Sequence, residues 1–420
     1  MKLIILLLSF FLCQYSSGQS QSKKVLFLGN SYTYVNNLPQ MVSDMAISAG
    51  DALIYDSNAI GGYTLKGHSS NSTSLAKIAT GNWDYVVLQE QSQLPAAPIK
   101  QVESEVFPYA QILDSIINAK NSCAETVFYR TWGRKNGDSE KCASWPQVCT
   151  YQSMDSLLQL RYMKMAIDNE AILSPVGEVW KYLRRNFPKL ELYSSDESHP
   201  AVAGTYAAAC CFYTILFRKD PGLITFNAGL QASDAAAIRA ATKIVIFENL
   251  TKWKVGTYDP IAKFSYTNLA SNQFVFKNNS ANANSYLWNF GDGNTSTEIN
   301  PTHTYASSGM FETELQAIKC NLKSSAIEKL QTGILSATQN QNEEAKIIIS
   351  PNPVVSDLNL KIEESLMGST YEIFNLDGKV VDKGNLLSLN NLIETPTLSN
   401  GFYILCVGSK FKKPFVVAGK

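Results

Sequence analysis

The spacing of hydrophobic residues changes character near residue 253 and divides the chain into two parts. Before that point, short apolar runs alternate with longer stretches in which apolar residues recur at helical spacing. The runs are rich in Val, Ile and Leu without strict alternation, which is typical of buried parallel strands. We expect strands at residues 25–28, 53–55, 85–89, 126–129 and 171–176.

The stretches between these runs predict helices. Asn37 is a candidate N-cap for the first helix, with Pro39 in its first turn and Gly50 just after its end. Five strands joined by helices predict an α/β fold, a doubly wound parallel sheet with right-handed crossovers. The expected helices span residues 38–49, 102–119, 151–169, 179–186, 201–217 and 232–253.

The part after residue 253 has β patterns instead. Residues 261–335 show alternation and the turn pair Asp292-Gly293, which predicts a small antiparallel sandwich. Residues 336–344, SATQNQNEE, form a polar linker. Residues 345–420 predict further short strands, with turns at Pro351-Asn352-Pro353, Asp377-Gly378 and Asn400-Gly401. We therefore expect three domains, at residues 24–255, 261–335 and 345–420.

Residues 1–18 predict a secretory signal peptide. Lys2 precedes an apolar run at residues 3–12, and the small residues Ser16, Ser17 and Gly18 follow it. The run is too short for a membrane helix of roughly 20 residues, and no later run is long enough to span a bilayer. Cys13 raises a lipoprotein alternative, which the bulky Leu12 before it disfavours. We expect a soluble, exported mature protein.

Charge and cysteine content narrow the classes of function. Lys+Arg 36 balance Asp+Glu 36, which excludes a nucleic-acid binder because such a protein needs a basic surface. One of the eight cysteines is Cys13, and the spacing of the others matches neither a zinc site nor a disulfide-dense framework. Cys142 and Cys149 bracket one short loop, so a disulfide there is one reading and two free thiols the other.

Three residues have the types and places that nucleophilic catalysis needs. Ser31 follows the first strand, where a doubly wound sheet places its ligands, although a helix-capping serine is the alternative. Far downstream, His199 follows Asp196 by three residues and precedes a helix. Such a turn at the carboxyl edge of the sheet can place Asp196 against one ring nitrogen of His199 while the other ring nitrogen faces Ser31.

The segments around these residues resemble blocks of the SGNH/GDSL hydrolase family. GNSYT at residues 29–33 is similar to the block that carries the nucleophile, and DESHP at 196–200 to the block that carries the acid and the base. Residues 58–64 match the second block, with Gly62 at the oxyanion position. The third block departs from the usual Gly-x-Asn-Asp, since residues 85–92 are YVVLQEQS, which resembles the carbohydrate-esterase branch.

The resemblance implies a flavodoxin-like five-stranded sheet and acyl transfer without a cofactor or metal. His199 would deprotonate Ser31, and Asp196 would stabilise the imidazolium. The N–H groups of Ser31 and Gly62 would bind the oxyanion together with the side-chain amide of Gln89, with Gln91 as the alternative. Thr33 stands where the GxSxG elbow of α/β-hydrolases requires glycine.

The implied activity is hydrolysis of acyl esters, most readily acetyl esters on carbohydrate. The altered third block motivates a second hypothesis, a surface protein that binds glycan on this scaffold without turnover. His68 is expected to be structural, with a place in the cleft as the alternative. Trp132 and Trp145 have two open readings, as platforms for sugar rings or as cover for the core.

The two trailing segments also resemble known domains. SYLWNFGDG at residues 285–293, with NPTHTY at 300–305, is similar to a PKD sandwich, which implies that Trp288 and Tyr305 are core and His303 is structural. SPNP at 350–353, the NLDGK hairpin at 375–379 and NGFYIL at 400–405 resemble the C-terminal sorting domain of the Bacteroidetes type IX secretion pathway. That domain implies the secretion machinery as a partner, and release or surface attachment afterwards.

Overall fold

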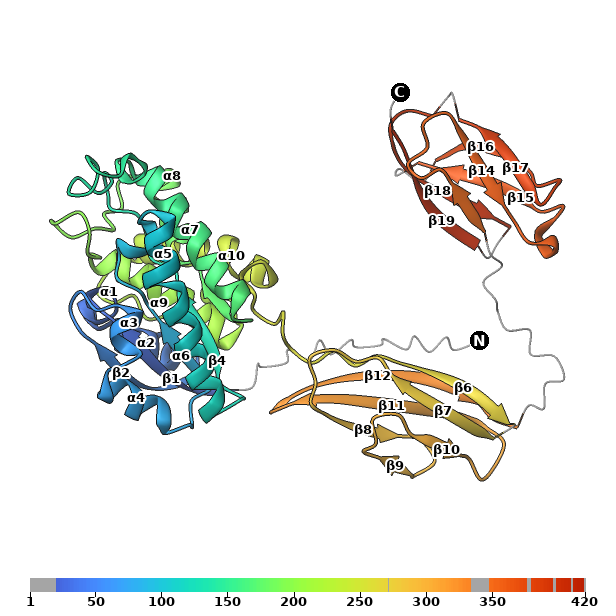
Figure 1. Ribbon diagram of the computed structural model, residues 1–420, viewed down its shortest axis with the longest axis horizontal. Helices are drawn as coiled ribbons and strands as arrows, with labels where there is room; N and C mark the ends of the chain where they lie inside the picture. Colours follow the sequence, from blue (N-terminus) through green and yellow to red (C-terminus); the bar gives the residue numbers. More distant parts are fainter. Residues whose placement is uncertain are drawn as a thin grey trace, which may run out of the picture. The chain divides into compact units, whose positions relative to one another are not determined.

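Five parallel strands form the central sheet of the first domain in the computed structural model (Figure 1). The structure describes residues 20–270, 272–333, 347–375, 379–395, 398–408 and 411–418. The predicted signal peptide, the linker at 336–344 and the turn Asp377-Gly378 lie outside these residues. The strand order is β2-β1-β3-β4-β5, the flavodoxin-like order, so the predicted doubly wound fold is confirmed. The strands are β1 (Ser22–Gly29), β2 (Ala52–Ala59), β3 (Tyr85–Leu88), β4 (Glu125–Tyr129) and β5 (Ile172–Ser174).

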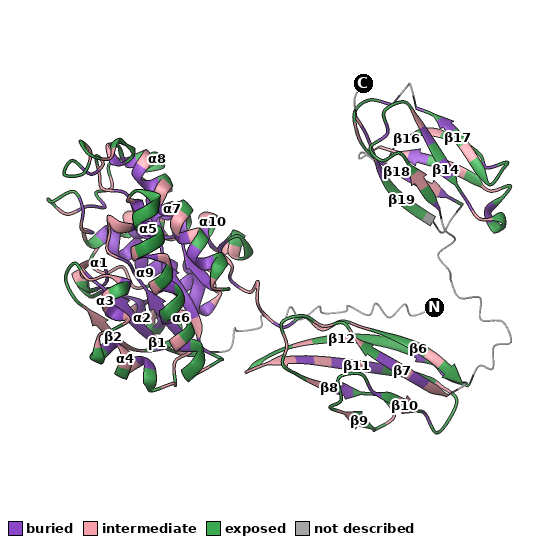
Figure 2. Ribbon diagram, viewed as in Figure 1, coloured by how far each residue is buried: buried purple, intermediate pink, exposed green. Residues whose placement is uncertain are grey.

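Helices cover the sheet in two packed groups. Helix α9 (Val202–Phe217) packs against α2 (Leu38–Ser48), α8 (Val176–Asn186) and α10 (Ala232–Val245). Helix α6 (Phe107–Lys120) packs against α4 (Ser72–Ala79) and α7 (Tyr151–Asp168). Every residue of α9 from Ala203 to Phe217 is buried, which explains its almost wholly apolar sequence (Figure 2).

The helix expected at residues 102–119 is in fact two helices. One residue, Val106, separates helix α5 (Ile99–Glu105) from α6. Pro108 has no N–H to donate and clashes with the preceding turn, so a continuous helix cannot pass through it, but it fits the first turn of a new one. The helix expected up to residue 253 likewise ends at Val245 and continues as a 3-10 segment, Phe247–Trp253.

Residues 264–331 form a two-sheet sandwich with strand orders β10-β7-β6 and β12-β11-β8-β9. Its core includes Trp288 and Tyr305, which are 0% and 1% exposed, in agreement with the sequence. His303 bonds to Asp292 and stacks on Phe290, so its structural role is confirmed. The strands are β6 (Phe264–Ala270), β7 (Gln273–Asn278), β8 (Ser285–Asn289), β9 (Thr295–Ser296), β10 (Thr302–Thr304), β11 (Met310–Lys319) and β12 (Leu322–Gln331).

A disulfide between Cys123 and Cys320 links the first domain to this sandwich, with the two Cα atoms 5.7 Å apart. Cys123 precedes β4, and Cys320 lies in the turn between β11 and β12. Arg218 also pairs with Asp259 on the connecting segment, one of its nitrogens donating at 3.0 Å. This cross-link could not be predicted from the sequence, because its cysteines lie 197 positions apart.

The last described segment is a second all-β unit with its own core. Two sheets, ordered β13-β14-β17 and β16-β15-β18-β19, enclose a cluster of buried aliphatic and aromatic side chains that includes Leu360, Ile373 and Leu405. The strands are β13 (Ile348–Ser350), β14 (Asp357–Lys361), β15 (Thr370–Phe374), β16 (Val380–Asn385), β17 (Asn390–Glu394), β18 (Gly401–Val407) and β19 (Phe411–Val417).

Candidate active site

Ser31 lies at the carboxyl end of β1, at the point where the strand order of the sheet reverses. It is the first residue of a single helical turn, α1 (Ser31–Tyr34). Asn30, not Ser31, caps this turn, since its side-chain oxygen accepts the Tyr32 N–H at 3.2 Å. The Ser31 hydroxyl is therefore not used for capping and lies at the crevice where open α/β sheets bind ligands.

The three residues expected to form a triad lie together. His199 Nε2 is 2.8 Å from Ser31 Oγ, and His199 Nδ1 bonds to Asp196 Oδ2. The second oxygen, Asp196 Oδ1, accepts the N–H groups of Ser198 at 3.1 Å and His199 at 2.9 Å. This places the base between an acid that orients it and a hydroxyl that it can deprotonate.

The same contacts keep Asp196 ionised. Burial acts to raise the pKa of Asp196, but the hydrogen bonds from His199 and from the two N–H groups outweigh it, so the pKa lies below the usual value. The side chains of His199 and Asp196 are 35% and 47% exposed, so the site is open to solvent. A carboxylate here stabilises a positive charge on the His199 ring.

The turn that carries Asp196 and His199 is fixed by its own backbone and by neighbouring segments. Glu197 adopts φ 59°, and the Ser194 N–H donates to the His199 carbonyl at 2.8 Å. The Glu197 carbonyl accepts the Lys135 N–H at 2.9 Å. The Asn36 amide donates to the Pro200 carbonyl at 3.0 Å. The turn is thus tied to the loop after β4 and to the segment after α1.

Gly62, which the sequence predicts as an oxyanion donor, lies in a left-handed part of the backbone. It follows β2 and adopts φ +67°, a left-handed conformation that glycine takes without steric cost. The Ile60 N–H donates to the Gly29 carbonyl at 3.2 Å, which keeps this segment beside the end of β1. Within residues 20–270, no acceptor takes the N–H of Ser31 or of Gly62.

The assignment of Gln89 as an oxyanion donor is wrong, because its side-chain amide is fully used inside the protein. Gln89 is completely buried, and its Oε1 accepts the Asn30 N–H and the Thr33 hydroxyl, both at 2.9 Å. Its Nε2 donates one hydrogen to Asn30 Oδ1 at 2.8 Å and the other to the Glu90 carbonyl at 2.7 Å. Gln89 therefore holds in place the turn that begins with Ser31.

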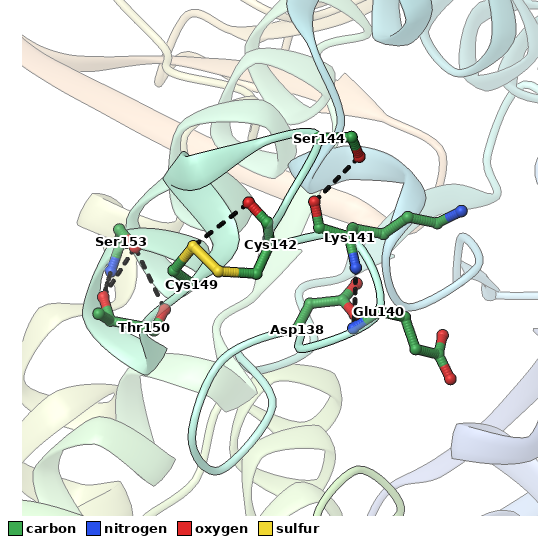
Figure 3. The surroundings of a disulfide bond; sticks show 8 residues. All are labelled: Asp138, Glu140, Lys141, Cys142, Ser144, Cys149, Thr150 and Ser153. Atoms are coloured by element: carbon green, nitrogen blue, oxygen red, sulfur yellow. Dashed lines mark hydrogen bonds between the residues drawn. A yellow bond between two sulfur atoms is a disulfide. The ribbon is translucent and has the colours of Figure 1, made fainter.

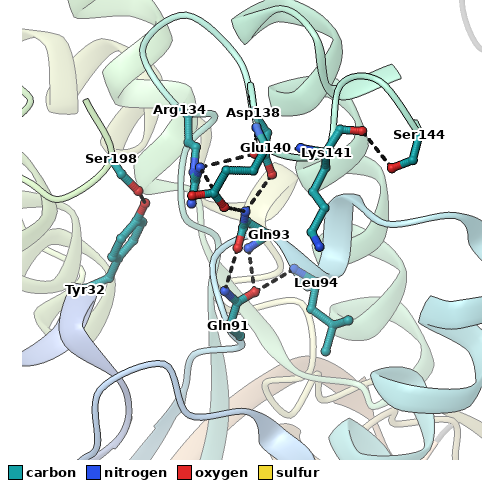
Figure 4. Close-up of polar contacts among 10 residues, drawn as sticks. All are labelled: Tyr32, Gln91, Gln93, Leu94, Arg134, Asp138, Glu140, Lys141, Ser144 and Ser198. Carbon is teal, nitrogen blue, oxygen red and sulfur yellow. Dashed lines mark hydrogen bonds and ion pairs between the residues drawn. The ribbon is translucent and has the colours of Figure 1, made fainter. Parts of the chain in front are cut away.

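The alternative donor, Gln91, shapes the loop after β3 (Figure 4). Its Oε1 accepts the N–H groups of Gln93 at 2.8 Å and Leu94 at 2.9 Å, and its Nε2 donates to Gln93 Oε1 at 3.1 Å. Gln93 in turn donates to Asp138 Oδ2 at 2.7 Å. Since no described residue takes the second amide hydrogen of Gln91, this glutamine still has a donor for a ligand.

Glu90, between the two glutamines, was not singled out by the sequence. It is completely buried and accepts the N–H groups of Leu65 and Gln91, the latter at 2.6 Å. Burial raises its pKa to about 8, although both N–H groups act in the opposite direction. Tyr162, whose hydroxyl accepts the Glu90 N–H at 3.2 Å, packs beneath it. An acidic residue between two polar ones gave no hint of such burial.

Trp132 belongs to the core and is no platform for sugars. It is 0% exposed and is stacked between Tyr32, at a centroid distance of 4.8 Å, and Trp180, at 3.7 Å. Trp145 is half-buried, packs against the same core and donates to the Ala96 carbonyl at 2.9 Å. The aromatic residues of this loop therefore support the site from inside.

His68 is structural, as expected. It is completely buried, with Nδ1 2.7 Å from Ser74 Oγ and Nε2 3.0 Å from the Gly29 carbonyl. Burial lowers its pKa, although the bond to Gly29 acts against this. A buried imidazole with both nitrogens bonded to the protein stays neutral and supports the end of β1.

A disulfide between Cys142 and Cys149 closes the loop that leads to α7 (Figure 3). Asp138 accepts the Glu140 N–H at 3.2 Å at the start of this loop, and Thr150 caps α7 by accepting the Ser153 N–H at 3.2 Å. Of the two readings left open by the sequence, the structure has the disulfide.

Among the residues that the structure describes, no group of three or more His, Cys, Asp or Glu residues could hold a metal ion. None of the described helices is both long and apolar enough to cross a membrane.

Family models match the two trailing domains. Residues 260–327 match the PKD domain, and residues 348–416 match the secretion system C-terminal sorting domain. Both predicted resemblances are confirmed. The sorting domain marks the protein for export to the cell surface or the extracellular space.

Similar solved structures include a candidate SGNH hydrolase from Slackia heliotrinireducens, 26% identical, with 46% of this chain and 99% of that chain covered and a TM-score of 0.39. A protein from Bacteroides uniformis, in a family named for a domain of unknown function, is 18% identical over 55% of this chain and 99% of that one, with a TM-score of 0.48. Among curated proteins, collagenase ColA from Bacillus cereus is 68% identical over 31 residues, which are 7% of this chain and 3% of the collagenase.

Proposed function

We propose that the protein is an exported serine ester hydrolase that uses Ser31, His199 and Asp196. One observation carries the proposal: Ser31 Oγ lies 2.8 Å from His199 Nε2, while His199 Nδ1 bonds to Asp196. This arrangement has the geometry that a nucleophile, a general base and an orienting acid need.

In the proposed reaction, His199 takes the proton of Ser31 as its oxygen attacks the ester carbonyl. The N–H groups of Ser31 and Gly62 stabilise the oxyanion, and the remaining amide hydrogen of Gln91 is the candidate third donor; each donor lowers the barrier by about 3 kcal/mol in comparable sites. His199 then protonates the leaving alcohol, and water hydrolyses the acyl-enzyme with His199 again as base.

We propose small acyl esters of carbohydrate, acetyl esters first, as substrates. Tyr34 shares one helical turn with Ser31 and is 50% exposed, so its ring is available to stack on a sugar. Its hydroxyl lies 3.5 Å from the place where a Cβ on Gly61 would stand, which sets the ring beside the second block. The net charge of zero suits an uncharged substrate.

We also propose the route by which the protein leaves the cell. Residues 1–18 direct it across the inner membrane as a signal peptide, and the sorting domain engages the type IX secretion machinery at the outer membrane. The protein is then released or attached to the surface.

The test is hydrolysis of a short-chain aryl acetate by the purified protein and by Ser31→Ala. We expect the variant to lose nearly all turnover, by a factor of at least about 10³, because the nucleophile is gone. Full activity in Ser31→Ala would disprove the nucleophile. Acetylated xylan, acetylated pectin and acetylated sialic acid, compared with long-chain lipid esters, test the substrate class.

A second candidate function is glycan binding without turnover. It is favoured by the side chain of Gln89, whose amide hydrogens are both used internally, so the usual third oxyanion donor is missing at that position. Tight glycan binding without acyl release, together with no labelling of Ser31 by a fluorophosphonate, would support this candidate against the esterase.

A further inference from the structure

Two adjacent residues after β1 bond to two adjacent residues of the turn that carries Asp196 and His199. Beside the Ser31–His199 contact, the Tyr32 hydroxyl lies 2.7 Å from Ser198 Oγ (Figure 4). The second contact is shielded from water, since Tyr32 is 2% and Ser198 8% exposed. The two segments, more than 160 residues apart in sequence, are thus joined by a bond that takes no part in acyl transfer.

Trp132 fixes both partners of this second bond. Its indole Nε1 donates to the Ser198 carbonyl at 3.0 Å, and its ring lies parallel to the Tyr32 ring, with an interplanar angle of 7°. The other face of the indole stacks on Trp180. The Tyr32 ring also meets His199 edge to face, at a centroid distance of 5.3 Å. The phenol and the serine are therefore held by a rigid aromatic stack.

The Asp196–His199 bond cannot fix the distance between His199 and Ser31. These residues are three positions apart on one turn, so their bond fixes the rotation of the imidazole but moves with the turn. The distance from His199 to Ser31 depends instead on contacts that reach from the turn to other segments. Proton transfer is sensitive to this distance, and a displacement of about 1 Å can cost about a hundredfold in rate.

We propose that the Tyr32 hydroxyl is a positioning group that, through Ser198, sets the distance between the general base His199 and the nucleophile Ser31. The inference rests on the proposed esterase function. The phenol remains protonated at neutral pH, because burial raises the pKa of Tyr32 although the hydroxyls of Ser198 and Ser92 act against this. Tyr32 is only 2% exposed, so its proposed role lies in the catalytic step and not in substrate binding.

The test compares Tyr32→Phe, Ser198→Ala and the double variant. We expect each single variant to lower kcat by roughly tenfold to a hundredfold with KM changed less than about twofold. Since both substitutions remove the same bond, the double variant should lose little more than either alone. Tyr213→Phe is the matched control: it removes the hydroxyl of a buried tyrosine that donates to Asp51 at 3.2 Å, just before β2 and at the opposite edge of the sheet.

A readout independent of turnover separates this inference from the esterase function. The nitrogen NMR signal of His199 Nε2, which reports its contact with Ser31, should shift or broaden in Tyr32→Phe and Ser198→Ala but not in Tyr213→Phe. If the wild-type protein hydrolyses no ester, the proposed function fails and this signal alone tests the positioning role. Wild-type kcat with an unchanged signal in Tyr32→Phe, or losses that add in the double variant, would overturn the inference.

Discussion

Asn30 and Gln89 exchange two hydrogen bonds across the ends of β1 and β3. The Asn30 N–H donates to Gln89 Oε1 at 2.9 Å, and Gln89 Nε2 returns a bond to Asn30 Oδ1 at 2.8 Å. The same Asn30 oxygen caps the turn that begins with Ser31. The turn that begins with Ser31 is therefore held by a buried amide pair that joins the ends of β1 and β3, and this pair makes Gln89 a structural residue.

Replacing Gln89 by Leu should lower stability sharply. It leaves the Asn30 N–H and the Thr33 hydroxyl buried without an acceptor, which costs roughly 2 to 5 kcal/mol in free energy of unfolding. Gln91→Leu, at a half-buried site, is the control and should cost less. Urea unfolding followed by tryptophan fluorescence gives both values. Equal stability losses in the two variants would contradict the structural role of Gln89.

Gly62→Ala tests the oxyanion position. A residue with a Cβ at φ +67° is strained by about 1 kcal/mol, and relief of that strain moves the N–H away from the oxyanion. Gly50→Ala is a matched control, because Gly50 has φ +82° and equally open space but lies after α2. Both variants should lose similar stability, whereas only Gly62→Ala should lower kcat, by tenfold to a hundredfold. Unchanged kcat in Gly62→Ala would exclude this donor.

The features that depend on local sequence patterns could be predicted from the sequence. β1, β3, β4 and β5 carry buried apolar runs because both faces of the sheet are covered there, whereas the apolar run of the edge strand β2 is short and mostly half-buried. Ser31 and the Asp196–His199 turn were predictable because strand ends and histidines are few. The break between α5 and α6 was missed because the apolar spacing continues across Pro108, although a proline inside a helical pattern is itself a warning.

Contacts between segments that are distant in sequence could not be predicted from local patterns. Gln89 and Gln91 both follow the third strand, and only the bonds to Asn30 show which amide is already used. The Tyr32–Ser198 bond and the Cys123–Cys320 disulfide likewise depend on how remote segments meet. A resemblance to family blocks supplied the roles of single residues but not the bonds that hold them in place.

Glu90 should make stability depend on pH. With its pKa at about 8, the folded protein keeps a proton on Glu90 that the unfolded chain releases above its ordinary value. Stability from this group is therefore full at about pH 4 and falls by roughly 1 kcal/mol per pH unit until the folded carboxyl also ionises near pH 8. Glu105 contributes to the raised pKa through its negative charge.

Glu90→Gln isolates this effect because it keeps the shape and removes the charge. The difference in unfolding free energy between variant and wild type, from urea titrations at pH 5, 6.5 and 8, should move in favour of the variant as pH rises. Other titrating groups are common to both proteins and cancel. A difference that stays constant from pH 5 to 8 would show that Glu90 ionises normally in the fold.

The two disulfides should differ in how much they contribute to the free energy of unfolding. Cys123–Cys320 spans 197 residues and Cys142–Cys149 spans 7, so the longer loop restricts the unfolded chain more. The chain-entropy relation gives a difference of roughly 3 kcal/mol in unfolding free energy. We expect Cys123→Ser with Cys320→Ser to destabilise the protein by about that much more than Cys142→Ser with Cys149→Ser, in matched urea titrations. Peptide mass spectrometry without reduction should first recover both linked pairs. Equal losses in the two double variants would mean that the long link leaves the unfolded chain no more restricted than the short one.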